Sequence, residues 1–207
     1  MGRGPTDAVE LPHHERVARA EHVERAGEAG PVGHRAAAGV LVNPIGRDTD
    51  RPFLFPGSAA QWNGLTDMTD ARLLARQLEW ASTTPAAQNQ AFNVVNGDVF
   101  RWNWMWARIA EWFGLQPAPF SGQGTPLEQQ LADAALAWRE IAQRHGLTEP
   151  DLNRLASAWH TDADLGRPIE VVTDMSKSRK LGFLDYQATD DSFFHLFDTL
   201  RQARVIP

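Results

Sequence analysis

The chain changes its pattern of hydrophobic and polar positions near residue 47. Before this point Arg, Ala, Gly, His and Glu dominate, and all eight tryptophans and all ten phenylalanines come after it. Residues 15–29 have charged side chains at helical spacing, but a helix that is polar nearly all round has no face to pack. We therefore expect residues 1–46 to be a low-packing arm, either disordered or non-native through a misplaced start or a shifted reading frame. Residues 47–207 are expected to be the packed part.

Residues 92–114 show the clearest change of period in the packed part. A short apolar run at 92–95 meets a turn at Asn96-Gly97-Asp98, and apolar side chains then recur at helical spacing. The predicted helix face consists of Trp102, Met105, Trp106, Ile109 and Phe113, and Gly114 ends the helix. The pattern predicts a strand that turns into a helix.

The remaining pattern predicts further short strands and helices. Extended segments are expected at 53–55, 62–66 and 169–172, and a Gly/Pro-rich loop at 117–126. The expected helices are one capped by Asp67 or Thr69 with Leu73, Leu74, Leu78 and Ala81 on its face, one with a stripe of Leu127, Leu131, Ala134, Trp138 and Ile141 before Gly146, one from Pro150 through Leu152, Leu155 and Trp159, one at 176–181, and a last one with Phe193, Phe194, Phe197 and Leu200. The fold class that follows is α/β, with several helices on a short, incomplete sheet.

Composition narrows the possible partners. The chain has 207 residues, of which 43% are apolar, enough to bury a core. Its net charge of −6 gives no general attraction to nucleic acid or to an anionic membrane surface, and no apolar run approaches the roughly 20 residues that span a bilayer. The absence of cysteine excludes disulfides, thiolate zinc sites and cysteine nucleophiles. We expect a cytoplasmic protein with neither nucleic acid nor membrane as partner.

Two groups of residues in the N-terminal arm have the residue types of a binding site but lack the surrounding secondary structure that such a site needs. Gly27, Gly30 and Gly33 have the spacing of a dinucleotide fingerprint, but residues 20–26 make a poor buried strand in front of them. His13 and His14, with Glu10 and His22 nearby, are metal-ligating types on a segment with no fold to fix their geometry. We expect neither a cofactor nor a metal at these positions.

The packed part contains two weaker constellations. Trp102, Trp104 and Trp106 are a candidate stacking platform for a sugar or base, but on a helix Trp104 points away from the other two, so core packing is the favoured interpretation. Asp162 and Asp164 near His160 have the composition of an acid/base cluster. The favoured interpretation is that they lie in a solvated loop.

Three segments of the packed part resemble one enzyme family. Residues 65–71 and 92–98 resemble a strand-to-helix segment and a later strand and turn of the extended short-chain dehydrogenases, members of the NAD-dependent epimerase/dehydratase superfamily. Residues 174–183 are similar to the family's late Ser-Lys-x-x-x-x-Leu-Gly-(Phe/Trp) signature. Pro56-Gly57-Ser58 before Trp62, the Asn96 to Trp102 run and the ending Arg204-Val205-Ile206-Pro207 resemble the progesterone 5β-reductase/iridoid synthase-like branch. The resemblance covers residues 47–207 and only the C-terminal part of a family member.

The resemblance implies a Rossmann-like fold and, in the intact family, reduction of an activated carbon–carbon double bond beside a carbonyl by NADPH or NADH. A tyrosine hydroxyl assisted by a lysine would stabilise the enolate oxygen. Both groups lie upstream of the matched part in the family, whereas Tyr186, Lys177 and Lys180 lie in the wrong part of this chain, so no catalytic residue is carried over. The resemblance also implies that the segment with Trp159 and His160 contributes to the wall of the substrate pocket, although the branch commonly has an aromatic or apolar side chain where His160 stands. From residue chemistry alone, Trp159 is expected in the core and His160 at the surface or at the edge of the pocket.

Two classes of function follow. In the first, the chain is a truncated NAD(P)-dependent oxidoreductase-like protein that keeps the substrate-binding half, with a small-molecule carbonyl or enone as implied substrate, and that is inactive and binds no cofactor alone. In the second, it is a non-enzymatic interaction module that uses apolar surface left by missing strands. A sugar-binding protein built on the tryptophans is a weaker third alternative. An exposed sheet edge also predicts self-association.

Overall fold

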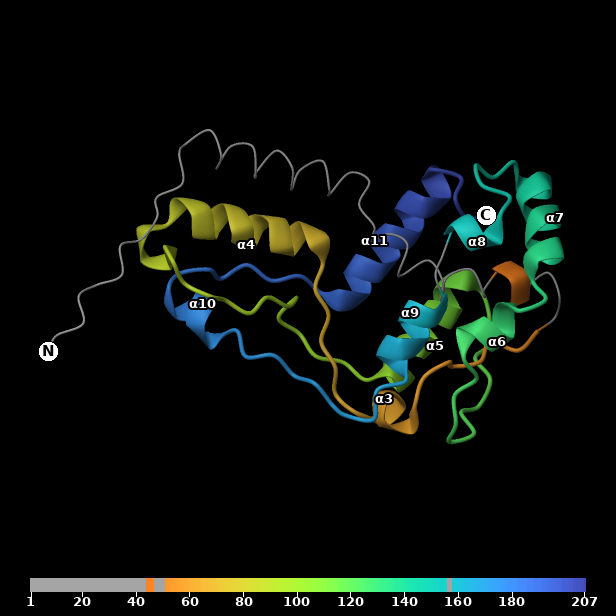
Figure 1. Cartoon of the computed structure of the whole chain (residues 1–207), viewed down its shortest axis with the longest axis horizontal. Helices are drawn as coiled ribbons and strands as arrows, with labels where there is room; N and C mark the ends of the chain where they lie inside the picture. The colour runs from red at the N-terminus through yellow and green to blue at the C-terminus, as the bar shows by residue number, and fades with distance from the viewer. Residues whose placement is uncertain (1–43, 47–50, 156–157) are drawn as a thin grey trace, which may run out of the picture.

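The computed structural model describes residues 44–46, 51–155 and 158–207, and this part of the chain is mostly helical (Figure 1). Its elements are α3 (Ala59–Asn63), α4 (Ala71–Thr83), the 3-10 helix η1 (Pro85–Ala87), α5 (Trp102–Phe113), α6 (Leu127–Leu131), α7 (Ala135–His145), α8 (Leu152–Leu155), α9 (Ala158–Leu165), α10 (Ser176–Lys180) and α11 (Thr189–Gln202). The helix expected at 15–29, the Gly27, Gly30 and Gly33 fingerprint, and Glu10, His13, His14 and His22 lie outside the described residues.

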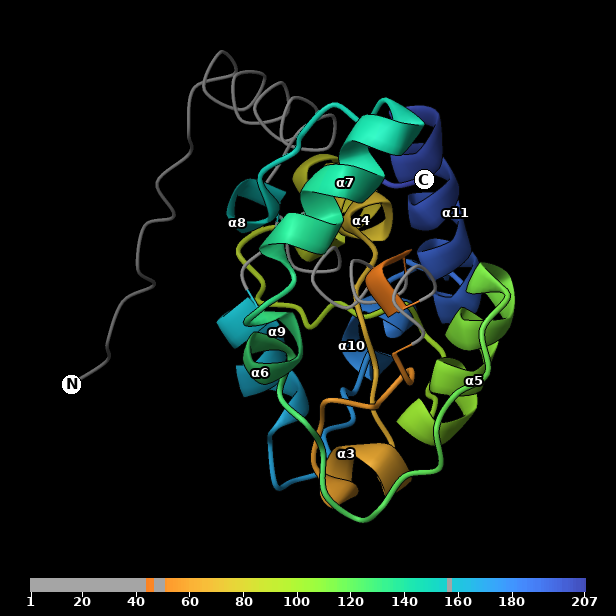
Figure 2. The same cartoon turned by 90° about the vertical axis from the view of Figure 1, so that its right-hand side faces the viewer.

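Two clusters of buried side chains hold the fold together. The larger is built around α5 and α7, with α6 packed on α9 (Figure 2) and α11 on α5. The smaller lies under α4 and consists of Leu73, Val95, Met175 and Phe183, with Trp80 packed against it. Ile45 is buried in the larger cluster, so packing begins at least two residues before the boundary expected at residue 47.

The predicted strands do not form a sheet in the described residues. Their pairing is limited to two isolated bridges, Phe53 with Pro117 and Thr66 with Phe100. The α/β prediction is therefore confirmed only coarsely, as helices with short extended segments. The backbone at 92–95 shows the reason. Two of its carbonyls accept from side chains, Asn93 from Gln77 Nε2 at 3.0 Å and Val94 from Thr69 Oγ1 at 2.8 Å, and not from a neighbouring strand. A ladder needs such a neighbour along its whole length.

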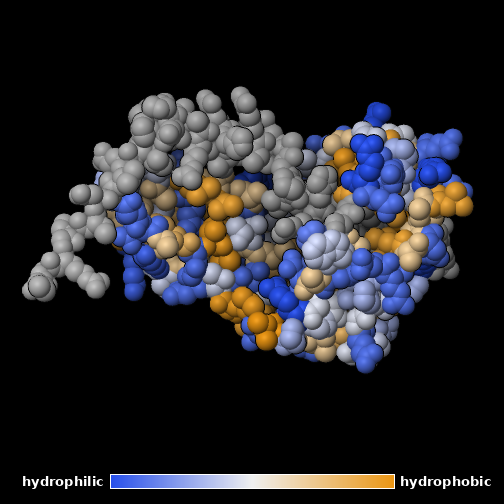
Figure 3. Space-filling view, viewed as in Figure 1, coloured by the Kyte–Doolittle hydropathy of each residue, from blue (hydrophilic) through white to orange (hydrophobic). Residues whose placement is uncertain are grey.

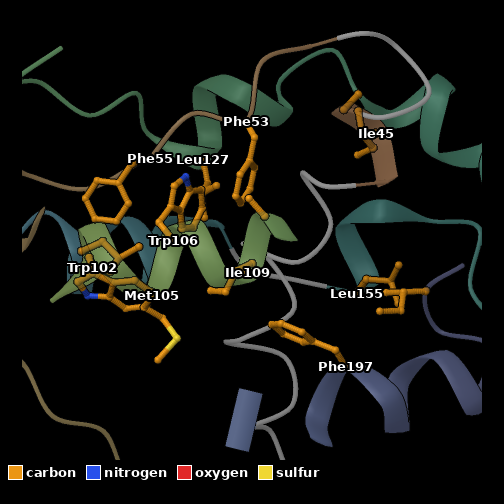
Figure 4. Close-up of a cluster of buried hydrophobic side chains, with 14 of the residues drawn as sticks. Ile45, Phe53, Phe55, Trp102, Met105, Trp106, Ile109, Leu127, Leu155 and Phe197 are labelled. Carbon is orange, nitrogen blue, oxygen red and sulfur yellow. The ribbon is translucent and has the colours of Figure 1, made fainter. Parts of the chain in front are cut away.

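Helix α5 and its tryptophans follow the sequence pattern closely. Trp102 and Trp106 are buried while Trp104 is 47% exposed, which confirms core packing over a three-tryptophan platform. Phe53 stacks on Trp106 with ring centroids 4.0 Å apart and planes within 9° (Figure 4). Gly114 caps the helix in the left-handed conformation, at φ 69°, where a side chain is strained.

The buried face of α4 differs from the predicted one. Leu73 is buried as expected, but Leu74 and Leu78 are 37% and 46% exposed, and the second fully buried position is Gln77. The Gln77 side-chain nitrogen donates to the Asn93 carbonyl, whereas Gln77 Oε1 is buried without a hydrogen-bond partner among the described residues. The buried face predicted from the leucines alone is therefore rotated around the helix axis, by about one residue, relative to the face that is buried in the structure.

Three further predictions need correction. Trp62 lies in α3, not in an extended segment, because the Ser58 hydroxyl accepts from the Gln61 amide at 3.1 Å and starts a helix there. The helix expected after Leu127 is broken at 132–134 into α6 and α7, although Leu127, Ala134, Trp138 and Ile141 are buried as predicted and Gly146 ends α7. Residues 169–172, expected as a strand, belong to no ladder of the described chain, and Ile169 and Val172 are exposed.

Candidate functional site

The three segments that carry the family resemblance meet at one hollow. Its volume is about 140 Å³. The first segment contributes Asp67, the second contributes Val95, Gly97 and Asp98, and the third contributes Asp174, Met175, Ser176 and Arg179. Val99 and Thr173, each one residue outside these segments, also line the hollow. Each segment was recognised singly from the sequence, but their convergence depends on contacts between residues about 30 and 80 positions apart.

Asn96 ties these segments together from a fully buried position. Its side-chain oxygen accepts from the Asp70 amide at 2.6 Å, and its side-chain nitrogen donates to Thr189 Oγ1 at 3.0 Å. Its main-chain amide donates to the Met68 carbonyl at 2.7 Å, and its carbonyl accepts from the Gln187 amide at 2.9 Å. Asn96 thus fixes the start of α4, the start of α11 and the turn at 96–98 that lies between them in space.

Two carboxylates at the hollow are also held by main-chain donors. Asp98 accepts from the Thr189 amide at 2.9 Å and from its hydroxyl at 2.6 Å. Asp67 accepts from the Thr173 amide at 2.5 Å. These bonds orient the walls of the hollow and leave Arg179 as the cationic side chain that lines it.

Asp174 is the third carboxylate that lines the hollow. It accepts from the Ser176 amide at 2.7 Å. Hydrogen bonding to the Ser176 side chain and amide, with the charges of Lys180 and Arg179, lowers the pKa of Asp174. The group therefore stays ionised to lower pH than an ordinary aspartate.

Among the carboxylates of the site region, Asp70, the N-cap of α4, has the most strongly shifted pKa. Burial favours its neutral form, but hydrogen bonds from the side chains of Arg72 and Ser192 and from the Arg72 amide, together with the Arg72 charge, outweigh burial. They lower the pKa of Asp70 from 3.8 to about 2. The carboxylate is charged throughout the neutral range and caps the helix end that Asn96 also holds.

Replacing Asp70 by asparagine is expected to lower the free energy of unfolding at pH 7 and to matter less as the solution is acidified. A depressed folded-state pKa gives stability that is fully present above the unfolded pKa near 4 and is lost as pH falls through about 2. Urea unfolding at pH 7, 4 and 2 measures the difference between the two proteins. Asp185→Asn, which breaks the exposed ion pair with Arg76, is the control and should cost less at pH 7. A difference for Asp70→Asn that stays constant between pH 4 and 2 would contradict the assignment.

The sequence-predicted substrate residues lie elsewhere. Trp159 is 55% exposed on α9, which corrects its expected place in the core, and His160 is half-buried beside it. Their rings stack with centroids 3.7 Å apart and planes at 28°. The structure brings these two side chains together but does not place either among the residues that line the hollow.

The suspected acid/base cluster has a different role. Asp162 lies in α9 and not in a solvated loop, and its carboxylate accepts from the Leu127 amide at 2.7 Å and from the Glu128 amide at 3.0 Å, at the start of α6. It is a cap supplied by a neighbouring helix, since the residue before α6 is Pro126 and has no side chain to do this. Sequence reasoning missed this because the two helices are 35 residues apart.

Replacing Asp162 by alanine is expected to cost about 1 kcal/mol of unfolding free energy, the usual range for loss of a helix cap. Asp164→Ala on the same helix is the control, since its main-chain oxygen, rather than its carboxylate, accepts the hydrogen bond from Arg167 Nε. Thermal unfolding followed by circular dichroism compares the two. Equal effects of the two substitutions would show that the capping bonds contribute nothing.

The turn at Gly97 does not fit the pyrophosphate of the reduced nicotinamide cofactor that the family resemblance implies. The extended segment, turn and helix at 92–113 contain one glycine, and a Cβ at Gly97 would lie 2.8 Å from Arg179 Nη2, so this glycine makes room for a neighbouring side chain. Asp67 and Asp98 place negative charge beside the same turn. A pyrophosphate cradle needs several close-approach glycines and a helix N-terminus free of carboxylates.

Comparisons with known proteins identify relatives of this part of the chain. It is 34% identical over 165 residues to an (S)-8-oxocitronellyl enol synthase of Camptotheca acuminata, a match that covers 79% of this chain and 42% of the relative. It is 35% identical over 154 residues to an (S)-8-oxocitronellyl enol synthase of Nepeta cataria, covering 74% and 39%. It is 34% identical over 158 residues to a 3-oxo-Delta(4,5)-steroid 5-beta-reductase of Arabidopsis thaliana, covering 75% and 40%.

No protein-family model matches the chain. The chain spans about two fifths of the length of these curated relatives. Among the helices that the structure describes, none is long and apolar enough to cross a membrane.

Proposed function

We propose, because this chain is related to the C-terminal part of the progesterone 5β-reductase/iridoid synthase-like branch of the extended short-chain dehydrogenases, that residues 47–207 are the substrate-binding part of an enone reductase-like protein. The observation that carries the proposal is the meeting of the three family-like segments at one hollow, because motifs kept in their spatial relation indicate a kept architecture. The substrate class is a small molecule with a double bond conjugated to a carbonyl.

The chain by itself binds neither NADPH nor NADH under this proposal and reduces nothing. The poor fit of the Gly97 turn to a pyrophosphate supports this, as does the expectation from the resemblance that the family's tyrosine and lysine lie upstream of the matched part. The chemistry that a reduced nicotinamide supplies, hydride transfer to the β-carbon, would need groups from outside residues 47–207.

Isothermal titration of the purified chain with NADPH and with NADH tests the cofactor half of the proposal. The expected result is no binding tighter than about 1 mM. Incubation with NADPH and a cyclic enone should give no absorbance loss at 340 nm beyond the protein-free rate. A micromolar affinity, or oxidation of NADPH that depends on the enone, would overturn the proposal.

Trp159 and His160 are proposed as part of the substrate-side wall. Their stacked rings form an exposed aromatic surface on α9, of the kind on which a flat enone can lie. A 3-oxo-Delta(4,5)-steroid is the probe, followed by saturation-transfer NMR on the isolated chain. Trp159→Ala and His160→Ala should weaken the signal, while Leu136→Ala, on the exposed face of α7, should not. Identical signals from all three variants would remove these residues from the site.

A second candidate, a non-enzymatic interaction module, is favoured by apolar side chains that remain at the surface. Ile169, Leu184 and Tyr186 are 59%, 74% and 71% exposed. A chain that shows neither cofactor nor enone binding, yet forms a defined complex with another protein, would support this candidate over the first.

A further inference from the structure

Two asparagines of the chain stand directly before a glycine, Asn63 before Gly64 and Asn96 before Gly97. The side-chain amide of an asparagine can react with the main-chain nitrogen of the next residue, and glycine obstructs this nitrogen least because it has no Cβ. The other asparagines precede proline, glutamine, valine, tryptophan or arginine. The two Asn-Gly pairs are therefore equal candidates by sequence, and the fold decides between them.

The fold protects Asn96 from this reaction. Asn96 is fully buried, its side-chain oxygen accepts from the Asp70 amide at 2.6 Å, and its side-chain nitrogen donates to Thr189 Oγ1 at 3.0 Å. The reaction requires the side-chain amide to turn toward the Gly97 nitrogen. This turn would break both bonds inside the protein, where water cannot replace them.

Asn63 is exposed at the end of α3, a helix of five residues. Its side-chain nitrogen donates to the Ala59 carbonyl at 3.1 Å, and the Gly64 amide donates to the Ala60 carbonyl at 2.7 Å. In Figure 1 α3 lies at the lower margin of the molecule, and Figure 3 shows this place as open surface beside a patch of hydrophobic residues. The end of so short a helix opens readily, so Asn63 can reach the reactive arrangement.

A cation is bonded to the peptide group that would react. Arg101 Nη1 donates to the main-chain carbonyl oxygen of Asn63, which belongs to the same amide as the Gly64 nitrogen. When this nitrogen loses its proton, negative charge spreads onto the carbonyl oxygen, where the guanidinium stabilises it in the manner of an oxyanion hole. The corresponding carbonyl of Asn96 accepts only from a neutral donor, the Gln187 amide.

We propose that Asn63 and Gly64 form a self-modifying site at which Arg101 promotes conversion of Asn63 to aspartate and isoaspartate. The Gly64 proton passes to hydroxide in the solvent, the nitrogen bonds to Asn63 Cγ, and the Cγ–Nδ2 bond breaks, so that Nδ2 takes a proton from water and leaves as ammonia. Water then opens the cyclic imide at either of its carbonyls. The inference is independent of the proposed function.

The isoaspartate product would disturb the segment that leads to the hollow. It adds one carbon to the main chain directly before Leu65, whose amide donates to Glu170 Oε1. The next residue, Thr66, exchanges main-chain bonds of 2.9 and 3.0 Å with Phe100, and Asp67 follows it. The amides of Thr66 and Phe100 should therefore exchange hydrogen about tenfold faster in the isoaspartyl form.

Peptide mapping by mass spectrometry, during incubation of the complete chain at pH 8, tests the site. In the folded chain Asn63 should be lost at least about tenfold faster than Asn96. In the chain unfolded by urea the two rates should agree within about twofold, because the protection of Asn96 is removed. The rate at Asn63 should rise with pH, since the reaction needs the Gly64 nitrogen without its proton.

Arginine variants test the role of the bonded cation. Arg101→Gln should slow the conversion of Asn63 about fivefold in the folded chain and leave the rate in urea unchanged. Arg139→Gln removes the same charge from an exposed position on α7, far from α3 in Figures 1 and 2, and should not change the rate. A purely structural role of Arg101 would have the opposite sign, because a loosened α3 speeds the reaction. Circular dichroism melting shows whether each variant keeps its fold.

Three outcomes would overturn the proposal: equal loss of Asn63 and Asn96 in the folded chain, loss of Asn63 only in urea, or an Asn63 rate that Arg101→Gln leaves unchanged or increases. Equal hydrogen exchange at Thr66 before and after conversion would overturn the effect on the segment before Asp67. None of these measurements involves NADPH or an enone, so a failure of the proposed function is distinguishable from a failure of this site.

Discussion

Replacing Asn96 by alanine should lower the free energy of unfolding by about 3 kcal/mol, the cost of leaving buried hydrogen-bonding groups without partners. The substitution removes the acceptor of the Asp70 amide and the donor to Thr189, while the main-chain bonds of residue 96 to Met68 and Gln187 remain. The start of α4 and the start of α11 would then be joined only through the backbone of the turn and the hydrogen bond from Ser192 to Asp70. Urea unfolding followed by circular dichroism measures the loss.

Asn93→Ala is the matched control for Asn96→Ala. Asn93 is exposed and its side chain makes a single bond, to the Asp174 carbonyl at 3.0 Å. Its loss should cost below about 1 kcal/mol, because water replaces the missing partner at an exposed site. If both variants unfold at the same urea concentration, Asn96 does not organise the site.

Elements whose signals are local were predictable from the sequence, and α5 is the clearest case. Its period, its turn at Gly97 and its stop at Gly114 all lie within about two turns of the residues they affect, so propensity and capping determine them. The stripe Ala134, Trp138 and Ile141 on α7 is of the same kind. Strands are different, because whether 92–95 becomes part of a sheet depends on a neighbour that the segment itself does not specify.

The candidate site shows the same limit. The family-like segments could be identified one by one, and with them Asp67, Asp98 and Asp174, but nothing in their spacing shows that the carboxylates meet at one hollow. Trp159 was expected inside because large aromatic residues are usually buried, yet α9 turns it outward while Leu165 fills the core. Burial of one residue on a short helix depends on how the helix is placed, which is a property of the whole fold.

Replacing Trp106 by alanine should lower the free energy of unfolding by about 4 kcal/mol, within the range for truncating a buried aromatic residue. Trp106 is 3% exposed, stacks on Phe53 and meets Phe55 edge-on with centroids 5.4 Å apart. Trp104→Ala, two residues earlier on the same helix, is the control. Trp104 is about half exposed and lies beside Arg108, and its loss should cost below about 1 kcal/mol.

Trp106→Phe separates ring packing from polar effects. The Trp106 Nε1 is buried without a hydrogen-bond partner among the described residues, so the indole N–H opposes folding while the ring favours it. Phenylalanine keeps a ring against Phe53 and removes the unpaired donor, and the variant should therefore lose only about 1 to 2 kcal/mol. Chemical denaturation of all three variants, followed by far-ultraviolet circular dichroism, gives the order Trp104→Ala, Trp106→Phe, Trp106→Ala. A loss for Trp106→Phe as large as that for Trp106→Ala would mean that the indole nitrogen has a bonding partner, and that stacking on Phe53 is not what holds α5 to the strand-like segment at 53–55.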